Sequence, residues 1–197
     1  MSIGNYGELQ QSIAGWLKRT NLTDRIPDFI ALAEAQLNRD LRTRQMASVY
    51  TRTTDQHIIT LPDDYLDAEK LELNGQTLTY TARWSADSPQ QRGDNRLFYT
   101  MVGKSVWIMR RVEPHSVFRL FYYQRLTPLS DLEPQNWLIE DAPDAYLYGS
   151  LLQAEPYLKN DARVQVWGSM YANLIQAMNS GSTRARSSGS ALVARSV

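Results

Sequence analysis

The sequence predicts an α+β fold in which a helical bundle, formed by the N- and C-terminal helices, carries an inserted antiparallel β-rich module. Apolar residues recur at helical spacing over the first 44 residues, and helical spacing returns over residues 141–178. Between these regions lie a Val-, Thr-, Tyr- and Ile-rich stretch and several turn signals. We therefore divide the chain into N-terminal helices (1–45), a β module (46–126), C-terminal helices (127–179) and an extended Ser/Arg tail (180–197).

The N-terminal region contains two helix patterns. Asn5 followed by Glu8 resembles a capping box, and the apolar stripe after it consists of Leu9, Ile13, Trp16 and Leu17. A turn over residues 21–24 separates this helix from a longer one that begins near Pro27. The apolar face of the longer helix consists of Ile26, Ile30, Ala33, Leu37 and Leu41. Its polar face consists of Glu34, Asn38, Arg39 and Arg42, and the pattern predicts an amphipathic helix that reaches about Arg44.

The central region is patterned as strands joined by short turns. Asn74-Gly75 lies between two alternating runs, which is a strong hairpin signal. Val102-Gly103-Lys104 separates the flanks of a second hairpin, and residues 85–95 have the composition of a polar loop. Val117–Tyr123 is typical of a further strand. We expect five to seven strands, and the short turns predict that they pair in antiparallel fashion.

Helical signals return after the β module. Asp141 is placed to act as an N-cap and Pro143 lies near the first helical position. Pro156 is expected to end this helix. A last amphipathic helix is predicted from the apolar residues Val164, Trp167, Met170, Tyr171, Leu174 and Met178. We expect Gly181 to end it.

The last eighteen residues, Ser180 to Val197, differ in composition from the rest of the chain. They contain six serines and three arginines, but neither an acidic nor an aromatic residue. Alone, such a segment cannot bury enough apolar surface to offset the entropy lost on ordering. We therefore expect an extended strap that becomes ordered on a neighbouring chain. Its candidate anchors are Arg184, Arg186 and Arg195, which suit bidentate contacts with carboxylates, and the apolar pair Leu192 and Val193.

Composition excludes several classes of protein. The 197-residue chain has a formal net charge of zero, with +3 in the tail and −3 in the remainder. A near-neutral body argues against a dedicated nucleic-acid-binding protein, but it is compatible with DNA passing by without sequence-specific binding. The absence of cysteine removes disulfides, thiolate nucleophiles and Cys-ligated zinc. Without a signal peptide or a run of about 18 apolar residues, we expect folding in the cytoplasm and no contact with a membrane.

Three groups of residues have the chemistry of catalytic or ligand sites. Gly103-Lys104-Ser105 lacks the upstream glycine and the following helix of a phosphate-binding loop, so a hairpin turn explains it better. His57 and His115 have no companion His or Cys at metal-ligand spacing. The acidic group consists of Asp63, Asp64, Asp67 and Glu69. Because it lacks the spacing of a calcium loop, we interpret it as a turn followed by a solvated face.

The aromatic run from Phe118 to Tyr123 has the residue types of a stacking surface for single-stranded nucleic acid. Only Arg119 and Arg125 add positive charge nearby, so a buried strand is the better interpretation. No Gly-x-Ser-x-Gly elbow is present, although a Ser/His/Asp arrangement is defined by geometry rather than by sequence. We therefore expect no catalytic, cofactor or metal site, and we interpret the protein as a component of an assembly.

Several segments resemble the head-to-tail adaptor (connector) proteins of tailed phages. Residues 26–42, from Ile-Pro-Asp-Phe-Ile to Asn-Arg-Asp-Leu-Arg, resemble the long helix of that family. The other similar segments are Leu61 to Leu66, Tyr122-Tyr123, Leu126 to Leu129, and the block from Trp137 to Leu158. The resemblance covers about residues 1–179, and it lies in the combination and order of these segments.

The resemblance implies a structural virion protein at the head–tail junction, folded in the cytoplasm of the host. Such a protein forms a homo-oligomeric ring, usually a dodecamer, that docks beneath the portal protein. The ring continues the channel for genomic DNA and offers a platform to the tail nozzle or tube protein. On this basis the turn with Asp63, Asp64 and Asp67, or alternatively a polar helix face, is expected to border the channel or a neighbouring subunit.

Two other functions are compatible with the sequence. A small phage or bacterial hydrolase would use His57 or His115 with nearby carboxylates. A capsid-decorating or tail-completion protein would join the virion without contact with the portal. The oligomeric state of the purified protein, alone and with portal protein, distinguishes an adaptor ring from a monomeric enzyme.

Overall fold

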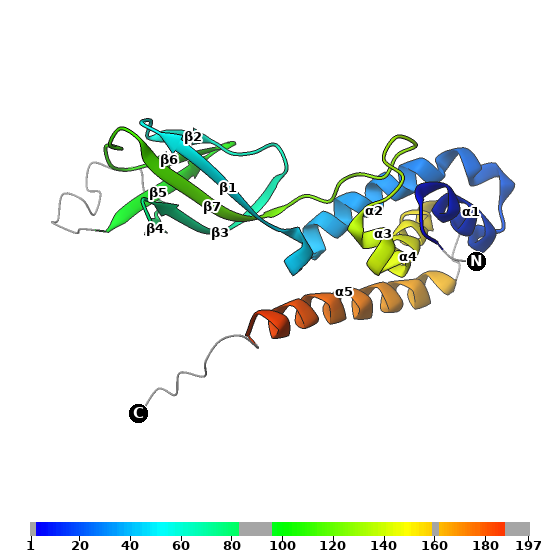
Figure 1. Ribbon diagram of the computed structural model, residues 1–197. Helices are drawn as coiled ribbons and strands as arrows, with labels where there is room; N and C mark the ends of the chain where they lie inside the picture. The colour runs from blue at the N-terminus through cyan, green and yellow to red at the C-terminus, as the bar shows by residue number, and fades with distance from the viewer. Residues whose placement is uncertain (1–2, 83–95, 159–161, 188–197) are drawn as a thin grey trace, which may run out of the picture. The chain divides into compact units, whose positions relative to one another are not determined.

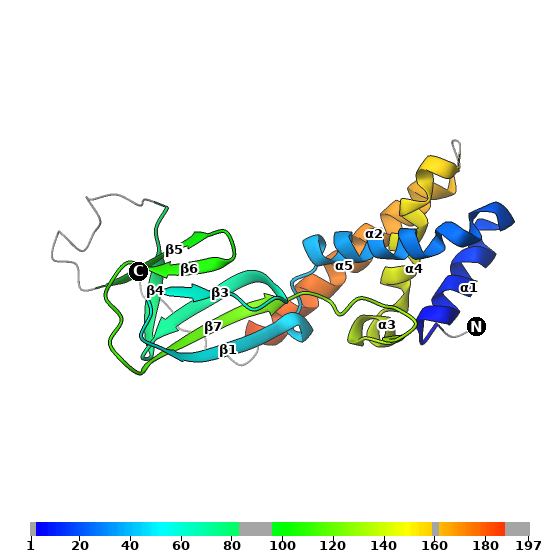
Figure 2. The same cartoon turned by 90° about the horizontal axis from the view of Figure 1, so that it is seen from above.

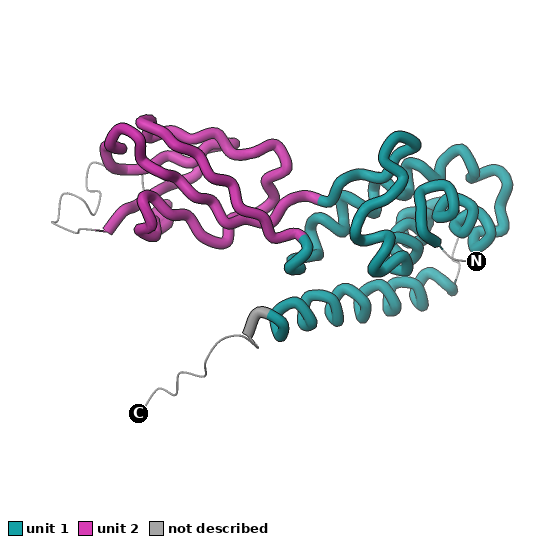
Figure 3. The backbone as a smooth tube through the Cα atoms, in the orientation of Figure 1, with its two compact units in different colours: residues 1–45, 126–197 teal, residues 46–125 magenta. Residues whose placement is uncertain are grey.

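The computed structural model describes residues 3–82, 96–158 and 162–187, and it confirms the α+β class. The chain divides into two compact units (Figure 3). Unit 1 comprises residues 1–45 and 126–197, and unit 2 comprises residues 46–125. Each unit has its own buried core.

Unit 1 is helical (Figure 1). Asn5 caps its first helix as the sequence predicts, because its side-chain oxygen accepts a hydrogen bond of 2.9 Å from the Glu8 amide. The α-helices of unit 1 are α1 (Tyr6–Leu17), α2 (Ile26–Asp40), α3 (Trp137–Asp141), α4 (Pro143–Gln153) and α5 (Arg163–Ser187). Short 3₁₀ turns also occur: η1 (Thr20–Arg25), η4 (Glu155–Tyr157) and η2 (Arg44–Met46), the last at the border with unit 2.

Helix α4 lies at the centre of unit 1 and packs against α1, α2, α3 and α5 (Figure 2). Most of its residues are buried on more than one side, so it shows little amphipathic pattern. Gly149 lies where three helices approach closely. A Cβ at this position would be 3.4 Å from both the Ala33 methyl of α2 and the Tyr171 ring of α5. The glycine therefore permits the tight packing of α2 and α5 on α4.

Unit 2 is a curled seven-stranded sheet with the order β1-β7-β3-β4-β5-β6-β2. The strands are β1 (Ala47–Thr54), β2 (Ile58–Thr60), β3 (Tyr65–Leu73), β4 (Gln76–Tyr80), β5 (Leu97–Val102), β6 (Ser105–Ile108) and β7 (Ser116–Gln124). The two predicted hairpin turns are present, with positive φ angles of 79° at Gly75 and 58° at Gly103. The chain enters and leaves unit 2 on adjacent strands, since Ala47 of β1 pairs with Tyr123 of β7.

The expectation of a purely antiparallel module was wrong for one strand pair. β4 and β5 are parallel, with Leu78 opposite Leu97 and Tyr80 opposite Tyr99. Residues 81–96 separate the two strands, and a connection of this length allows the crossover that parallel pairing requires. Short turns therefore predict antiparallel pairing correctly at the tight hairpins but not across the longest connection of the module.

The aromatic run in β7 belongs to the core of unit 2, where Phe118 and Leu120 are fully buried. Tyr122 is also buried, and its ring stacks on that of Tyr65 with the centroids 6.1 Å apart. These side chains are not available as a stacking surface for nucleic acid.

Two predicted helix boundaries were wrong. Helix α2 ends at Asp40 rather than near Arg44, because Leu41 is extended and buried. Asp141 is not an N-cap but the last residue of α3. Asn136 caps that helix, with its side-chain oxygen 3.1 Å from the amides of Leu138 and Ile139.

The prediction that the last helix stops at Gly181 and that the tail is extended from Ser180 was also wrong for residues 180–187. Helix α5 continues through Gly181 to Ser187. A glycine within a helix costs about 1 kcal/mol relative to alanine. Here the turn that contains Gly181 also contains Ser182, which is buried and bonded to the segment after α2. Tertiary contact therefore keeps this turn helical. The remaining residues of the predicted tail, 188–197, lie outside the described residues.

Candidate interaction sites

Helix α5 is bonded, from Tyr171 to Ser182, to the end of α2 and the segment that follows it. The Tyr171 hydroxyl donates to the Asp40 carboxylate at 2.9 Å, and burial together with this carboxylate raises the pKa of Tyr171. Asn179 donates to the Asp40 carbonyl at 2.8 Å and accepts from the Arg42 amide at 2.9 Å. The Ser182 hydroxyl accepts from the Arg44 amide at 2.7 Å. These bonds satisfy backbone groups left open where α2 ends.

The predicted anchors of the strap occupy different environments. Arg184 is exposed on α5, and its Nε donates to the Ser180 carbonyl at 3.4 Å. Arg186 lies on the last turn of α5. Leu192, Val193 and Arg195 lie outside the described residues. The helix therefore presents the first of these anchors on its surface, next to the turn that Ser182 attaches to Arg44.

A pocket of ≈ 230 Å³ lies beside the attached end of α5. Its walls come from residues 43–45 and from α5, including Ala177, Gly181 and Ala185. Thr43 is 2 % exposed, and its hydroxyl has no hydrogen-bond partner among the described residues. The small side chains of α5 leave this space open, and Arg44 is the one charged residue among the described residues that line it.

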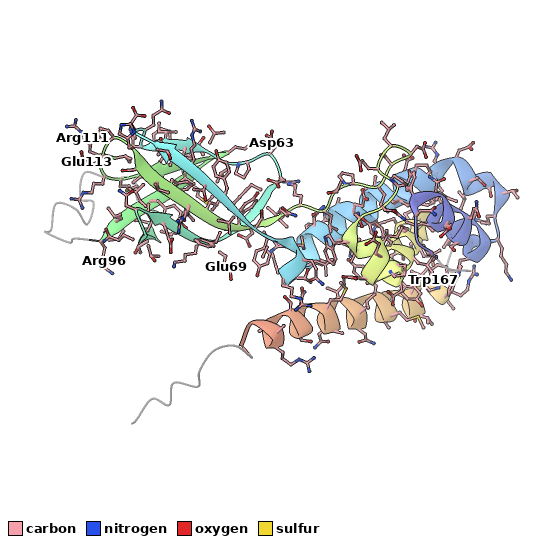
Figure 4. All side chains as sticks on the ribbon, in the orientation of Figure 1. Asp63, Glu69, Arg96, Arg111, Glu113 and Trp167 are labelled. Atoms are coloured by element: carbon pink, nitrogen blue, oxygen red, sulfur yellow. The ribbon has the colours of Figure 1, made fainter. Side chains whose placement is uncertain are left out.

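The predicted acidic turn connects β2 to β3, and its three aspartates have different surroundings. Asp64 accepts hydrogen bonds from the Tyr122 hydroxyl at 3.0 and 3.2 Å, and its carbonyl accepts from the Arg125 amide at 2.7 Å. Asp64 therefore holds the turn against the end of β7. Asp63 is exposed at the tip of the turn (Figure 4).

Asp67 is exposed on β3, close to the tyrosine side chains of the sheet. Burial raises the pKa of Tyr65, and the negative charge of Asp67 raises it further. Glu69, two residues along β3, is also exposed. A pocket of ≈ 360 Å³ at the acidic turn is lined by Asp63 together with Lys104 and Arg125. The charges around this pocket are mixed, so it has no strong preference for ligands of one sign.

Sequence reasoning missed a buried polar network in unit 1. Glu34 was assigned to the polar face of its helix, but it is only 7 % exposed. Its carboxylate accepts from the Leu129 amide at 2.7 Å and from the Tyr146 hydroxyl at 3.2 Å. Asn136 in turn donates to the Tyr146 oxygen at 2.7 Å and to the Thr127 carbonyl at 2.7 Å.

This network attaches the connection between β7 and α3 to helices α2 and α4. Burial raises the pKa of Glu34, although the two donated hydrogen bonds act in the opposite direction. Burial, with the nearby Glu34 charge, also raises the pKa of Tyr146. The available sequence signal was the position of Glu34 directly after Ala33 in the apolar stripe, which places it at the edge of the buried face.

Both histidines lie in unit 2. The His57 carbonyl accepts from the Ile108 amide at 2.7 Å, which continues the β2–β6 pairing. His115 has a φ angle of 61° in the turn before β7, and it borders a pocket of ≈ 220 Å³ with Thr53 and Asp55. Within residues 3–82, 96–158 and 162–187, no group of three or more His, Cys, Asp or Glu side chains is arranged to hold a metal ion.

Several large apolar side chains of unit 1 are exposed. Trp16 is 42 % exposed, although its ring contacts the Trp167 ring edge-on at 6.5 Å. Leu32 of α2 is 53 % exposed, and Val166 and Met170 of α5 are 53 % and 44 % exposed. Exposed apolar side chains are candidates for contact with other proteins where they form a contiguous patch.

No helix in the described part of the chain combines the length and the apolar character needed to cross a bilayer. No curated protein matches the sequence. A family model described as SU10 adaptor protein matches residues 4–195, which include both units and most of the segment after α5. The chain therefore belongs to the SU10 adaptor protein family, whose members are structural adaptor proteins of phages.

Proposed function

We propose that this protein forms a homo-oligomeric ring, a dodecamer, that joins the portal protein to the tail nozzle or tube at the head–tail junction. The observation that carries the proposal is the family match, because it extends over residues 4–195 and so includes both the helical and the β unit. As an adaptor, the chain acts by binding other virion proteins on more than one surface.

The exposed apolar side chains of unit 1 support ring formation. A ring of identical subunits needs a heterologous interface that closes, so two different surfaces of each copy must be complementary. Leu32 on α2 and the pair Val166 and Met170 on α5 supply apolar area on separate helices. Aromatic residues and methionine are enriched in interfaces of this kind, and Trp16 adds one.

The charge of the protein supports a channel for DNA. A lumen that DNA must cross should not bind phosphates tightly, and the formal net charge of this chain is zero. We propose that the turn with Asp63, Asp64 and Asp67 borders the lumen or a neighbouring subunit. Asp63 is the best candidate for direct exposure to either, because Asp64 is engaged by Tyr122.

The segment after α5 is proposed to act as the strap, with Arg184, Arg186, Leu192, Val193 and Arg195 as anchors on a neighbouring chain. The continuation of α5 to Ser187 places the first two anchors on a helix and the other three beyond it. Arg184 and Arg186 are therefore proposed to bind the neighbour from the end of α5, and Leu192, Val193 and Arg195 to bind it beyond the helix.

The mass of the purified protein tests the ring. We expect native mass spectrometry to show a defined oligomer, alone or after addition of portal protein. A chain that stays monomeric with portal protein present contradicts the proposal and favours the enzyme alternative. A ring that forms but never binds portal protein favours a tail-completion protein.

Deletion of residues 188–197 tests the strap. This deletion leaves α5 and the bond between Ser182 and the Arg44 amide in place, whereas deletion from residue 181 would also remove a packed turn. We expect the shortened protein to fold normally but to yield particles that lose DNA or lack tails. Particles that assemble, retain DNA and attach tails as the wild type does would show that the strap is not needed.

A further inference from the structure

The two edge strands of unit 2 differ in how well they are protected against further pairing. β2 has three residues, and Pro62 lies two residues after its end, so β2 offers little backbone to another strand. β1 has eight residues and pairs with β7 from Ala47 to Thr54 without a register shift. It contains no proline and only one charged residue, Arg52. Native edge strands are usually short, bulged, charged or interrupted by proline, and β1 has almost none of these protections.

The hydrogen bonds of β7 show which backbone groups of β1 point away from the sheet. The Asn74 amide donates to the Val117 carbonyl at 2.8 Å, so the backbone groups of Val117 face β3. Because these groups alternate along a strand, Ser116, Phe118, Leu120 and Tyr122 face β1 instead. Their partners in β1 are Thr54, Arg52, Tyr50 and Ser48. The N–H and C=O groups of Ala47, Val49, Thr51 and Thr53 therefore point to the free edge, where no backbone partner occurs among the described residues.

The outer face beside this edge is apolar at its centre. Val49 is 54 % exposed, and its neighbour across the strand pair is Phe121, which is half-buried. The Lys70 ammonium lies 5.8 Å from the centre of the Phe121 ring. A strand added beside β1 would gain main-chain hydrogen bonds from the free groups and an apolar contact at Val49.

We propose that the outer edge of β1 is a strand-acceptor site, and that its occupant is the segment of residues 188–197 from a neighbouring copy of this chain. The inference rests on the proposed function, because the ring supplies the neighbour. It goes further by naming the surface that receives the strap and the main-chain bonding that holds it.

Length and composition favour this occupant. Ten extended residues span about 33 Å, and the eight residues of β1 span about 26 Å, so the segment can cover the whole edge. The segment contains no proline and no acidic residue, and its apolar residues Leu192, Val193 and Val197 suit a strand beside Val49. The other long segment outside the described residues, 83–95, contains Pro89 in its middle, which disfavours a regular strand.

The substitution Thr51→Pro tests the acceptor edge in the full chain. The Thr51 amide points away from β7, so proline at this position leaves the β1–β7 hydrogen bonds intact and removes a donor from the free edge. We expect Thr51→Pro to fold and melt like the wild type and to fail in strap-dependent assembly with portal protein. The matched control Thr51→Ala keeps the amide and should assemble normally. Equal assembly by both variants would overturn the proposal.

Disulfide cross-linking identifies the occupant, and the absence of cysteine in this chain makes the experiment clean. The pair Val49→Cys and Val193→Cys should give disulfide-linked dimers and longer ladders under oxidation of the assembled ring. The control pair Thr60→Cys and Val193→Cys places the first cysteine at the exposed β2 edge and should give none. Moving the tail cysteine from residue 193 to residue 192 or 195, with Val49→Cys retained, tests the neighbouring registers.

The outcomes separate this inference from the proposed function. Cross-links within one chain would show that the occupant of the β1 edge comes from the same chain and not from a neighbour. Absence of cross-links at residues 192, 193 and 195 would show that the segment of residues 188–197 does not occupy this edge. A ring in which the Val49, Thr51 and Thr53 amides exchange hydrogen as fast as in the monomer refutes strand addition and leaves the adaptor function standing. If no ring forms, the same edge is tested by adding a synthetic peptide of residues 188–197 to the purified chain. Binding of this peptide to the wild-type chain but not to Thr51→Pro supports the site, and equal binding overturns it.

Discussion

At the scale of single residues, the most informative side chain is Glu34, a carboxylate buried between α2, α4 and the connection before α3. Two donors reach it, the Leu129 amide and the Tyr146 hydroxyl. A buried carboxylate with only two donors remains costly to ionise, which explains why the pKa of Glu34 is raised from 4.5. Its folded state therefore holds a proton over a pH range in which the unfolded chain has lost it.

This pKa shift has a defined effect on stability. The native state binds more protons than the unfolded state between 4.5 and the raised pKa of Glu34, so its contribution is complete below pH 4.5 and is lost as the pH rises through the raised value. A glutamine side chain at this position would keep an oxygen that accepts both hydrogen bonds without a charge. We expect the unfolding free energy of Glu34→Gln minus that of the wild type, both measured with urea, to become more positive from pH 4 to pH 7. A difference that is constant over this range would contradict the argument.

The hydrogen bonds of Glu34 are tested separately with Glu34→Leu. Leucine removes the charge but leaves the Leu129 amide and the Tyr146 hydroxyl without their acceptor. Each orphaned donor costs about 1–3 kcal/mol. Glu34→Leu should therefore be less stable than Glu34→Gln at every pH, as chemical denaturation can show. Equal stability of the two variants would mean that water replaces the carboxylate.

At the scale of elements, α5 depends on different contacts at its two ends. Near its start, Trp167 is 2 % exposed, and its ring contacts the Trp16 ring and the Arg163 guanidinium, which lies 5.3 Å from the ring centre. Figure 4 shows its position in the helical unit. Near its end, the contacts are polar and come from Asn179 and Ser182.

Removal of the tryptophan side chain tests the first of these contacts. We expect Trp167→Ala to lower the unfolding free energy by about 3–5 kcal/mol, because a fully buried aromatic ring leaves a large cavity. Thermal and urea unfolding of the monomer measure this loss. A melting temperature close to that of the wild type would show that Trp167 contributes to stability only in the assembled ring.

Two serines of α5 test the contacts at its end. Ser182→Ala leaves the Arg44 amide without its acceptor and should cost about 1–3 kcal/mol. Hydrogen exchange should also become faster in the last turns of the helix. Ser180→Ala is the control, since Ser180 is exposed and its hydroxyl only donates within the helix, to Ala177. Equal effects of the two substitutions would show that the bond to Arg44 does not hold the helix end.

At the scale of the whole molecule, the two units are joined by two chain connections that lie on adjacent strands. Ala47, the first residue of β1, is paired with Tyr123 near the end of β7. The β module has a core of its own, which includes Ile59, Leu71, Val106 and Phe118. This arrangement allows unit 2 to be removed without separating the ends of unit 1.

We predict that unit 2 is an independent folding unit. Residues 46–125 expressed alone should show a strand-type circular dichroism spectrum and a single cooperative unfolding transition. Residues 1–45 and 126–197, joined by a short Gly/Ser linker, should keep their helical content. A β module that unfolds on excision would show that its stability depends on unit 1.

Local sequence pattern predicted the elements that depend on residues close together in the sequence. The spacing of Leu9 and Ile13 predicted α1, and Asn74-Gly75 predicted the turn between β3 and β4, since helix period and turn chemistry are properties of neighbouring residues. The α+β class followed from the order of these patterns. The resemblance to phage adaptor proteins came from the same segments, and the family match supports it.

The errors occurred where residues distant in sequence determine the outcome. Glu34 is buried because Leu129 and Tyr146 lie beside it, and no local pattern contains that information. Gly181 would end an isolated helix, but the contact between Ser182 and Arg44 keeps α5 helical past it. Composition also did not show that β4 and β5 are parallel, because the direction of pairing depends on the path of the chain between them.

The sequence by itself determined the fold class, most of the elements, the lack of cysteine chemistry and the resemblance to an adaptor family, because these depend on composition and on short-range periodicity. Only the tertiary structure decided where the last helix ends, which carboxylate is buried and which sheet edge is free. Those features depend on which groups meet across the fold, and hydrogen bonds between distant residues can outweigh the local preference of a glycine or a glutamate by a few kcal/mol.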